Sequence, residues 1–204
     1  MTSDFELNVF INCPFDKKYT PLFDALLFSI YLCGYRPRCA LEIDNSAQVR
    51  IEKINNIIRE CKISFHDISR TELDKDSKLP RFNMPFELGL FLGSIAFGSG
   101  EQKEKIAIIA DKEKFRYQKF ISDVAGQDIK THNNNPEDLI KVVRNTLNSI
   151  NREKPLPGAT YILGKYEVFQ KGKPAIIRNL SLTKEDITYS DKIQIIENWL
   201  QMNL

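Results

Sequence analysis

Residues 5–33, FELNVFINCPFDKKYTPLFDALLFSIYLC, decide the fold because the pattern within them changes from strand to helix. Residues 5–13 have the apolar content of a strand. Residues 19–33 place apolar side chains at helical spacing, and Gly34 follows as a stop signal. This succession predicts a β–α unit, in which a strand ends and an outer helix begins.

The same alternation repeats over the next 80 residues or so. Strand patterns at residues 38–42, 63–68 and 105–110 (KIAIIA) alternate with helical patterns at 49–58 and 85–97. The strands are apolar on both faces, which is typical of parallel sheets covered by helices on both sides. We therefore expect an α/β fold of the flavodoxin-like type.

A change of character follows residue 111. Residues 112–124 are charged and predict a helix, residues 126–135 predict a polar loop, and Pro136 begins an amphipathic helix. The stretch KPLPG at 154–158 is typical of a linker because it combines two prolines with a glycine. The chain is thus predicted to contain an α/β domain and a C-terminal appendage.

The predicted boundary lies between residues 1–153 and 154–204. The appendage shows two or three short helical patterns, the last with Ser190 as its N-cap. Its apolar side chains are too numerous for a solvated tail and too few for an independent core. They must pack on the chain's own outer helices or on a second subunit.

Composition excludes several classes of protein. The chain has 204 residues, 42% of them hydrophobic and 27% charged, which is typical of a soluble globular protein. A net charge of +2 without a basic patch gives no strong nucleic-acid signal. No apolar run approaches the roughly 20 residues that span a bilayer, so no membrane partner is expected.

The number and spacing of the cysteines indicate the redox state of the compartment in which the protein works. The chain has four, with no CxxC spacing and no signal peptide ahead of them. Disulfides are rare in reducing compartments, so this usage predicts a reduced, cytoplasmic protein. With two histidines and no ligand spacing, no metal site is expected.

Polar residues gather where the predicted strands end, and in open parallel sheets ligands bind outside those carboxyl ends. Three segments converge there: residues 12–16 (NCPFD), 66–70 (HDISR) and 81–89 (RFNMPFELG). The residues in them that we expect to bind a ligand are Asn12, Phe15, Asp16, Arg70, Asn83, Met84 and Phe86. For the aromatic residues and Met84, lining of the core is the alternative.

Glu87 is the strongest candidate for a catalytic residue. It is the only ionisable side chain in residues 85–97, and both its neighbours are large and apolar. A carboxylate held against a core is a candidate functional group. The alternative is a glutamate in the first turn of a helix that only complements the helix dipole.

Other residues fit structural roles more readily. His66 and Asp67 would point to opposite faces of a strand, so His66 is expected to be buried and hydrogen-bonded. Gly89 and Gly93 are expected to permit close helix–sheet packing, since no GxGxxG motif or P-loop is present. A polar cluster of Asp123, Gln127, Asp128 and His132 could cap the site or form a solvated loop.

Four phrases carry a resemblance to a known superfamily: VFINCPFD, CGYRPRCALEID, IIRECKISFHDISR and FNMPFELGLFLG. Over residues 7–150 or so, the chain resembles the superfamily that joins TIR domains to nucleoside 2-deoxyribosyltransferases, and more narrowly the bacterial TIR-like proteins. In that superfamily the glutamate of the xxELG helix attacks or stabilises the ribose C1′ of a nucleoside or NAD. The resemblance assigns this role to Glu87. It places Asp67 where deoxyribosyltransferases have an acidic residue near the base.

The resemblance implies an N-ribosyl hydrolase or transferase with NAD or a related nucleotide as substrate and no separate cofactor. Nicotinamide leaves NAD as a neutral molecule, so a single carboxylate that stabilises a cationic ribose could suffice. An ordinary nucleoside base would also need an acid such as Asp67; a turn-forming Asx role is the alternative for that residue. The competing class of function is a non-catalytic nucleotide sensor or a TIR-type assembly module.

The resemblance also implies an assembly, because both branches of the superfamily work as oligomers. We therefore expect a homo-oligomer, to which the segment after Pro155 contributes. A symmetric dimer would be its simplest form. The usual small-residue turn before the glutamate is replaced here by Asn83-Met84-Pro85.

Overall fold

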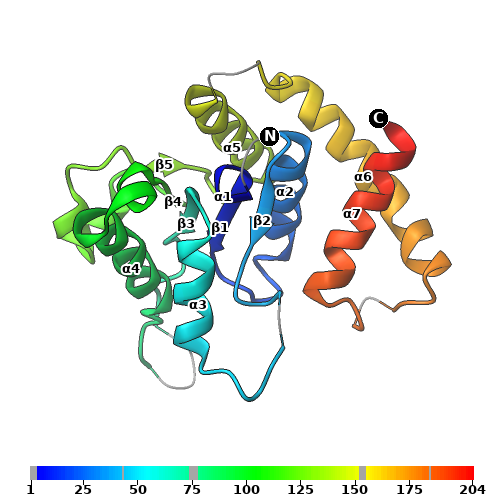
Figure 1. Cartoon of the computed structure of the whole chain (residues 1–204). Coiled ribbons are helices and arrows are strands. Elements are labelled where there is room, and N and C mark those ends of the chain that lie inside the picture. The colour runs from blue at the N-terminus through cyan, green and yellow to red at the C-terminus, as the bar shows by residue number, and fades with distance from the viewer. Residues whose placement is uncertain (1–3, 43, 74–77, 152–154, 184) are drawn as a thin grey trace.

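The computed structural model describes residues 4–42, 44–73, 78–151, 155–183 and 185–204 (Figure 1). These residues form a parallel sheet of five strands in the order β2-β1-β3-β4-β5. That order is the one found in flavodoxin-like folds. The expected fold class is therefore confirmed.

The strands are β1 Asn8–Asn12, β2 Arg36–Arg38, β3 Ile63–Asp67, β4 Ile106–Asp111 and β5 Lys130–Thr131. The α-helices are α1 Asp4–Leu7, α2 Thr20–Leu32, α3 Arg50–Arg59, α4 Asn83–Phe97, α5 Pro136–Ile150, α6 Ala159–Asn179 and α7 Tyr189–Asn203. Three 3₁₀ segments complete the described elements, η1 Gly100–Glu104, η2 Arg116–Lys119 and η3 Ser122–Val124. None of the described helices is both long enough and apolar enough to cross a membrane.

Strand alternation divides the core into two layers. In β1, Val9 and Ile11 belong to the cluster that packs with α2 and α5, whereas Phe10 packs with α3 and with Phe91 of α4. In β3, Phe65 shares the α2 and α5 side. Alternate residues of each central strand thus face different helices, as the pleat of a strand requires.

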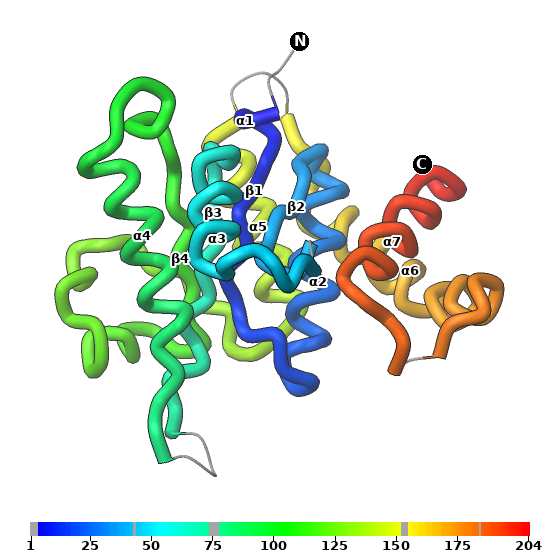
Figure 2. The backbone as a smooth tube through the Cα atoms, turned by 60° about the horizontal axis from the view of Figure 1, so that its bottom comes forward, coloured from blue at the N-terminus to red at the C-terminus, as the bar shows by residue number. Residues whose placement is uncertain are grey.

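The C-terminal helices α6 and α7 join the core on the α2 and α5 side. Figures 1 and 2 show them beside α2, on the side of the molecule opposite to α4. The ring of Trp199 lies 5.5 Å from that of Phe28 in α2 and 5.7 Å from that of Phe169 in α6. Packing on the chain's own helices, one of the two alternatives for this segment, is therefore what the structure shows.

A buried carboxylate links this segment to α2. Asp24 Oδ2 and Oδ1 accept hydrogen bonds from Lys173 of α6 and Lys192 of α7, at 2.5 and 2.7 Å. All three side chains are largely buried. Because one aspartate pairs with two lysines from different helices, it fixes both helices against α2.

Several strand and loop boundaries differ from the sequence-based expectations. Residues 4–7 form a short helix, and β2 ends at Arg38 because the chain turns at Cys39, where Glu42 N–H bonds to the Cys39 carbonyl. The segment at 112–124 contains two 3₁₀ turns rather than a helix, and Phe115, just before the first of them, has a left-handed φ of 62°. The short edge strand β5 lies within the expected loop. Its two residues contain no apolar run that could have predicted a strand.

The helix predictions also need three corrections. Helix α4 begins at Asn83, two residues before Pro85. The appendage forms one 21-residue helix that continues through Pro174, because its buried side chains hold it against the core, followed by α7. Helix α7 is capped by Thr188, which forms a capping box with Asp191, rather than by Ser190.

The two glycines of α4 do not serve helix–sheet packing. A Cβ atom built at Gly89 would meet nothing within 4 Å, and one at Gly93 would meet only the ring of Phe97 at 3.9 Å. Both glycines therefore lie on the outer face of α4, away from the sheet. The expectation of close packing at these positions was wrong.

Candidate functional site

A cavity of about 740 Å³ opens at the carboxyl edge of the sheet. The loop after β1, the loop after β3 and the first turns of α3 and α4 line it. Its walls include Asn12, Cys13, Pro14, Phe15, Asp16, Lys18, Arg50, Arg70, Glu72, Leu73, Arg81, Asn83, Met84 and Glu87. This is where a parallel α/β sheet is expected to bind a ligand.

Glu87 lies in the wall of this cavity, with 7% of its surface exposed. Burial raises the pKa of its carboxyl group to about 7, and the positive charge of Arg50 partly offsets that effect. No hydrogen bond to the carboxylate is found among the described residues. The group is therefore poised to change its protonation near neutral pH.

Asn12 holds the start of α4 against the sheet. Its side-chain amide nitrogen donates to the Met84 carbonyl oxygen at 2.8 Å and lies 2.9 Å from His66 Nδ1. His66 is fully buried between the rings of Phe10 and Phe91, and burial lowers its pKa to about 3. A neutral imidazole thus positions Asn12, and Asn12 positions the helix turn that carries Glu87.

The cavity has an excess of positive charge. Four cationic side chains line it, from Lys18, Arg50, Arg70 and Arg81, against three acidic ones. The Nε atom of Arg70 is buried and has no hydrogen-bond partner in the described part of the chain. An unpaired buried donor is costly in a protein interior, and an anionic ligand could supply the partner that this Nε–H group lacks.

Two of the three acidic side chains are already engaged. Asp16 Oδ1 accepts the backbone N–H groups of Lys18 and Tyr19 at 2.9 and 3.0 Å, just before α2. Glu72 pairs with Lys112. The third, Glu87, is the carboxylate left facing the cavity.

The first turns of α3 and α4 add to this positive field. Helix α3 begins at Arg50 and α4 at Asn83, and neither helix start has a side-chain cap. Free N–H groups at a helix start favour anions. Together with the arginines they give the cavity the charge that a phosphate group requires.

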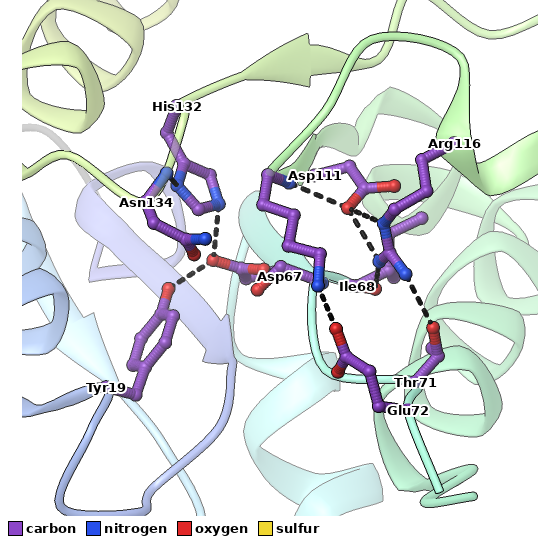
Figure 3. Close-up of polar contacts among 11 residues, drawn as sticks. Tyr19, Asp67, Ile68, Thr71, Glu72, Asp111, Arg116, His132 and Asn134 are labelled. Carbon is purple, nitrogen blue, oxygen red and sulfur yellow. Dashed lines mark hydrogen bonds and ion pairs between the residues drawn. The ribbon is translucent and has the colours of Figure 1, made fainter.

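Asp67 lies outside this cavity, on the other face of the sheet. It is fully buried, and its Oδ2 atom accepts the Tyr19 hydroxyl while Oδ1 accepts the Ser69 N–H at 2.8 Å (Figure 3). His132 Nε2 lies 3.1 Å from Oδ2. Asp67 thus joins the ends of three loops.

The protonation states in this cluster follow from its contacts. Asn134 N–H donates to His132 Nδ1 at 3.2 Å, so Nδ1 acts as an acceptor while Nε2 faces Asp67. Burial alone would raise the pKa of Asp67, but its contacts with His132, Ser69 and Tyr19 outweigh burial and lower it. Asp67 is therefore ionised and has no proton to donate. Its role is to hold the surrounding loops in position.

A second buried carboxylate braces the loop after β3. Asp111 Oδ1 accepts the Nε and Nη2 groups of Arg116, which also reaches the Ile68 carbonyl oxygen and the Thr71 hydroxyl (Figure 3). Burial raises the pKa of Asp111, an effect that Arg116 partly offsets. This brace orders the segment that carries Arg70 into the cavity wall.

The structure brings most of the expected site residues together. The cavity wall contains Asn12, Phe15, Asp16, Arg70, Asn83, Met84 and Glu87. Phe86 is 57% exposed on the outer face of α4, and Asp67 is buried on the other side of the sheet. Of the polar cluster, His132 contacts Asp67, whereas Asp123, Gln127 and Asp128 are exposed.

Three cationic residues of the cavity wall were not among the predicted ligand-binding residues: Lys18, Arg50 and Arg81. Each stands close to the start of a helix that follows a strand, which is the signal that could have identified them. Cys13 also lines the cavity, but burial raises its pKa well above the usual range, so it is not a reactive thiolate.

A larger cavity, of about 980 Å³, lies at the opposite, amino edge of the sheet. Its wall includes Leu7, Leu32, Tyr35, Ile106 and Leu156, and its lysine, Lys62, pairs with Glu6. Since parallel sheets bind ligands at the carboxyl edge, and since that edge holds Glu87, we place the candidate site there.

Among the residues that the structure describes, no three histidine, cysteine, aspartate or glutamate side chains gather closely enough to hold a metal ion. No protein-family model, curated protein or solved structure matches this chain.

Proposed function

We propose that this protein is an N-ribosyl hydrolase or transferase of the TIR-like and deoxyribosyltransferase-like kind, which cleaves the N-glycosidic bond of NAD or a related nucleotide. The observation that carries the proposal is the carboxyl group of Glu87, buried in the wall of a 740 Å³ cavity with its pKa raised to about 7. A carboxyl group in a cavity whose pKa is strongly raised by burial is a candidate catalytic group.

The charge of Glu87 suits the chemistry of ribose transfer. Loss of the base leaves positive charge on the ribose C1′, and a nearby carboxylate in a dry site stabilises that charge or attacks the carbon. A pKa close to 7 also suits a general base, which removes a proton from the incoming water. In hydrolysis, water then forms the new C1′–O bond, and Glu87 or solvent takes the released proton.

Among the described residues, no second carboxyl group faces the cavity beside Glu87 without being held by another contact, which favours a substrate whose leaving group needs no proton. Asp67 is ionised and lies on the far face of the sheet, while Asp16 and Glu72 are held by other contacts. Nicotinamide leaves NAD as a neutral molecule, whereas an ordinary base would need protonation. The arrangement therefore supports NAD or a similar pyridinium nucleotide over a nucleoside.

The positive wall supports a phosphate-bearing substrate. Arg70 has a buried and unpartnered Nε atom, and Arg50 stands at the uncapped start of α3. A pyrophosphate or phosphate group would supply the missing partners, because arginine and helix starts both bind such groups well. This feature also fits the alternative function, a non-catalytic nucleotide sensor.

Incubation of the purified protein with NAD, followed by chromatographic measurement of nicotinamide, tests the proposal. We expect release that falls about a hundredfold or more in Glu87→Gln, which keeps the shape but removes the charge. The control is Glu101→Gln, the same change at an exposed position in η1. Tight NAD binding by calorimetry without nicotinamide release would favour the sensor and refute the enzyme.

A further inference from the structure

The outer face of α4 is an exposed apolar surface. Phe82, Phe86 and Phe97 are 66%, 57% and 92% exposed, and Gly89 is exposed between them. Leu90 is partly buried against the α3 side of the core. Helix α4 carries one ionisable residue, Glu87, so this face has no charge of its own.

Helical geometry places these residues in one stripe. With 100° per residue, positions 82, 86, 89, 90, 93 and 97 fall within an arc of about 100°. The buried residues of α4, Met84, Leu88 and Phe91, fall on the opposite side of the helix. We call the six positions, Phe82, Phe86, Gly89, Leu90, Gly93 and Phe97, the α4 stripe.

Close packing within the described part of one copy does not require either glycine of the α4 stripe. Glycine destabilises the interior of a helix relative to alanine, and a Cβ atom at Gly89 would meet nothing. Gly93 is similar, because its Cβ would touch only Phe97. Glycine at these two positions would allow another backbone or a large side chain to approach the helix closely, because glycine has no Cβ atom.

The order of residues in the α4 stripe is symmetric about its middle. Phe82 and Phe97 stand at the two ends, Phe86 and Gly93 come next, and Gly89 and Leu90 stand at the centre. In an antiparallel pair of such helices, Phe86 would face Gly93 of the partner subunit. The same contact would recur in the other direction, as a two-fold axis requires.

We propose that the α4 stripe is the contact surface of a two-fold dimer of this chain, with the two α4 helices packed antiparallel. Phe86 of each copy occupies the space above Gly93 of the partner subunit, and Phe82 packs against Phe97 of the partner subunit. A second copy fits this surface because the central positions of the stripe pair a large side chain with a glycine, and the ends pair ring with ring. Neither copy brings a charge into the contact.

The area of this surface suits a dimer. Aromatic side chains bury about 150–250 Å² each, so the three exposed phenylalanines with the exposed Leu73 and Leu79 nearby offer roughly 600 Å². Interfaces at the lower end of the standard range bury about 600 Å² on each partner. An apolar patch of this size is at the upper end of what monomers expose, and such patches are often contact surfaces.

The dimer would also bear on the candidate site. Phe82 lies between Arg81 and Asn83, which both line the cavity. The antiparallel pairing brings Phe97 of the partner subunit beside Phe82. The second copy therefore covers the outer side of one cavity wall.

Solution mass measured by light scattering or sedimentation tests the proposal. The wild type should show twice the chain mass, and Phe86→Glu with Phe97→Glu should weaken the dimer about a hundredfold or more, since each change occurs twice in the contact. Val168→Glu, at a 52% exposed apolar position in α6, is the matched control and should stay dimeric. Both phenylalanines are exposed, so circular dichroism should show that the double variant remains folded.

Oxidative cross-linking gives a second readout that identifies the contact. Gly89→Cys lies beside the two-fold axis and should yield a covalent dimer, whereas Val168→Cys should not. The four native cysteines are buried and their pKa values are raised, so they do not compete. A single-chain mass for the wild type at about 100 µM, or a dimer that survives the glutamate substitutions, overturns the proposal.

Discussion

The substitution Glu87→Gln should make the protein more stable, and the gain should depend on pH. The pKa of this carboxyl group is about 7 in the folded protein against 4.5 for an ordinary glutamate. Between these two values the folded protein keeps a proton that the unfolded chain releases. The free energy of unfolding of the wild type therefore falls as pH rises from about 4.5 to about 7.

The size of the effect follows from the shift. Each pKa unit corresponds to about 1.4 kcal/mol, so the ionised side chain destabilises the fold by about 3 kcal/mol once the pH exceeds 7. Glutamine cannot ionise and avoids this cost. The variant should match the wild type near pH 4.5 and exceed it by about 3 kcal/mol at pH 8.

Urea unfolding of both proteins at a series of pH values between 5 and 9 measures this difference. Glu101→Gln is the control, because it makes the same change of side chain at an exposed position. A difference between variant and wild type that is the same at pH 5 and pH 8 would refute the reasoning. It would mean that the carboxyl group of Glu87 reaches water and is not held in an apolar wall.

Four further measurements test the candidate site and the packing around it. The kcat/KM for NAD should rise with pH and level off above about 7, because the ionised Glu87 is the active form, and a flat profile would contradict that role. Arg70→Met should weaken the binding of ADP-ribose about tenfold or more in calorimetry while the melting temperature changes little, since its Nε has no partner to lose. Asp67→Asn should lower the free energy of unfolding by about 2 kcal/mol at pH 7 in urea, with the loss shrinking as acid protonates the wild-type carboxylate. Asp24→Asn should expose the segment near residue 155 to limited proteolysis, because the lysines of α6 and α7 lose their shared partner; an unchanged digestion pattern would show that the apolar contacts alone hold these helices.

The strand and helix order could be predicted from the sequence because the buried strands are short, apolar on both faces and separated by clear helical patterns. The segment KIAIIA, for example, is a short run rich in isoleucine, which is typical of a buried strand, and it forms β4. Ends of elements were less predictable, since the turn at Cys39 and the start of α4 at Asn83 depend on contacts made across the fold. Tertiary packing also joined the appendage patterns into one helix through Pro174.

The candidate site was predictable where the strand ends determine it. Asn12 and Glu87 lie at the carboxyl edge as expected, on the same side of the sheet. The position of Asp67 follows from strand parity, because Phe65 and Asp67 share one face of β3 and His66 takes the other. The partners Tyr19 and His132 come from distant loops, so no local pattern could reveal them.

The single tryptophan makes the packing of the C-terminal helices visible in solution. Trp199 is 3% exposed, and its ring lies between α2 and α6, so its fluorescence reports on whether α7 remains seated on the core. The emission should shift to longer wavelength when water reaches the indole. Far-ultraviolet circular dichroism reports on the helices of the whole chain. If both signals change at the same urea concentration, α6 and α7 unfold together with the sheet, as one cooperative unit.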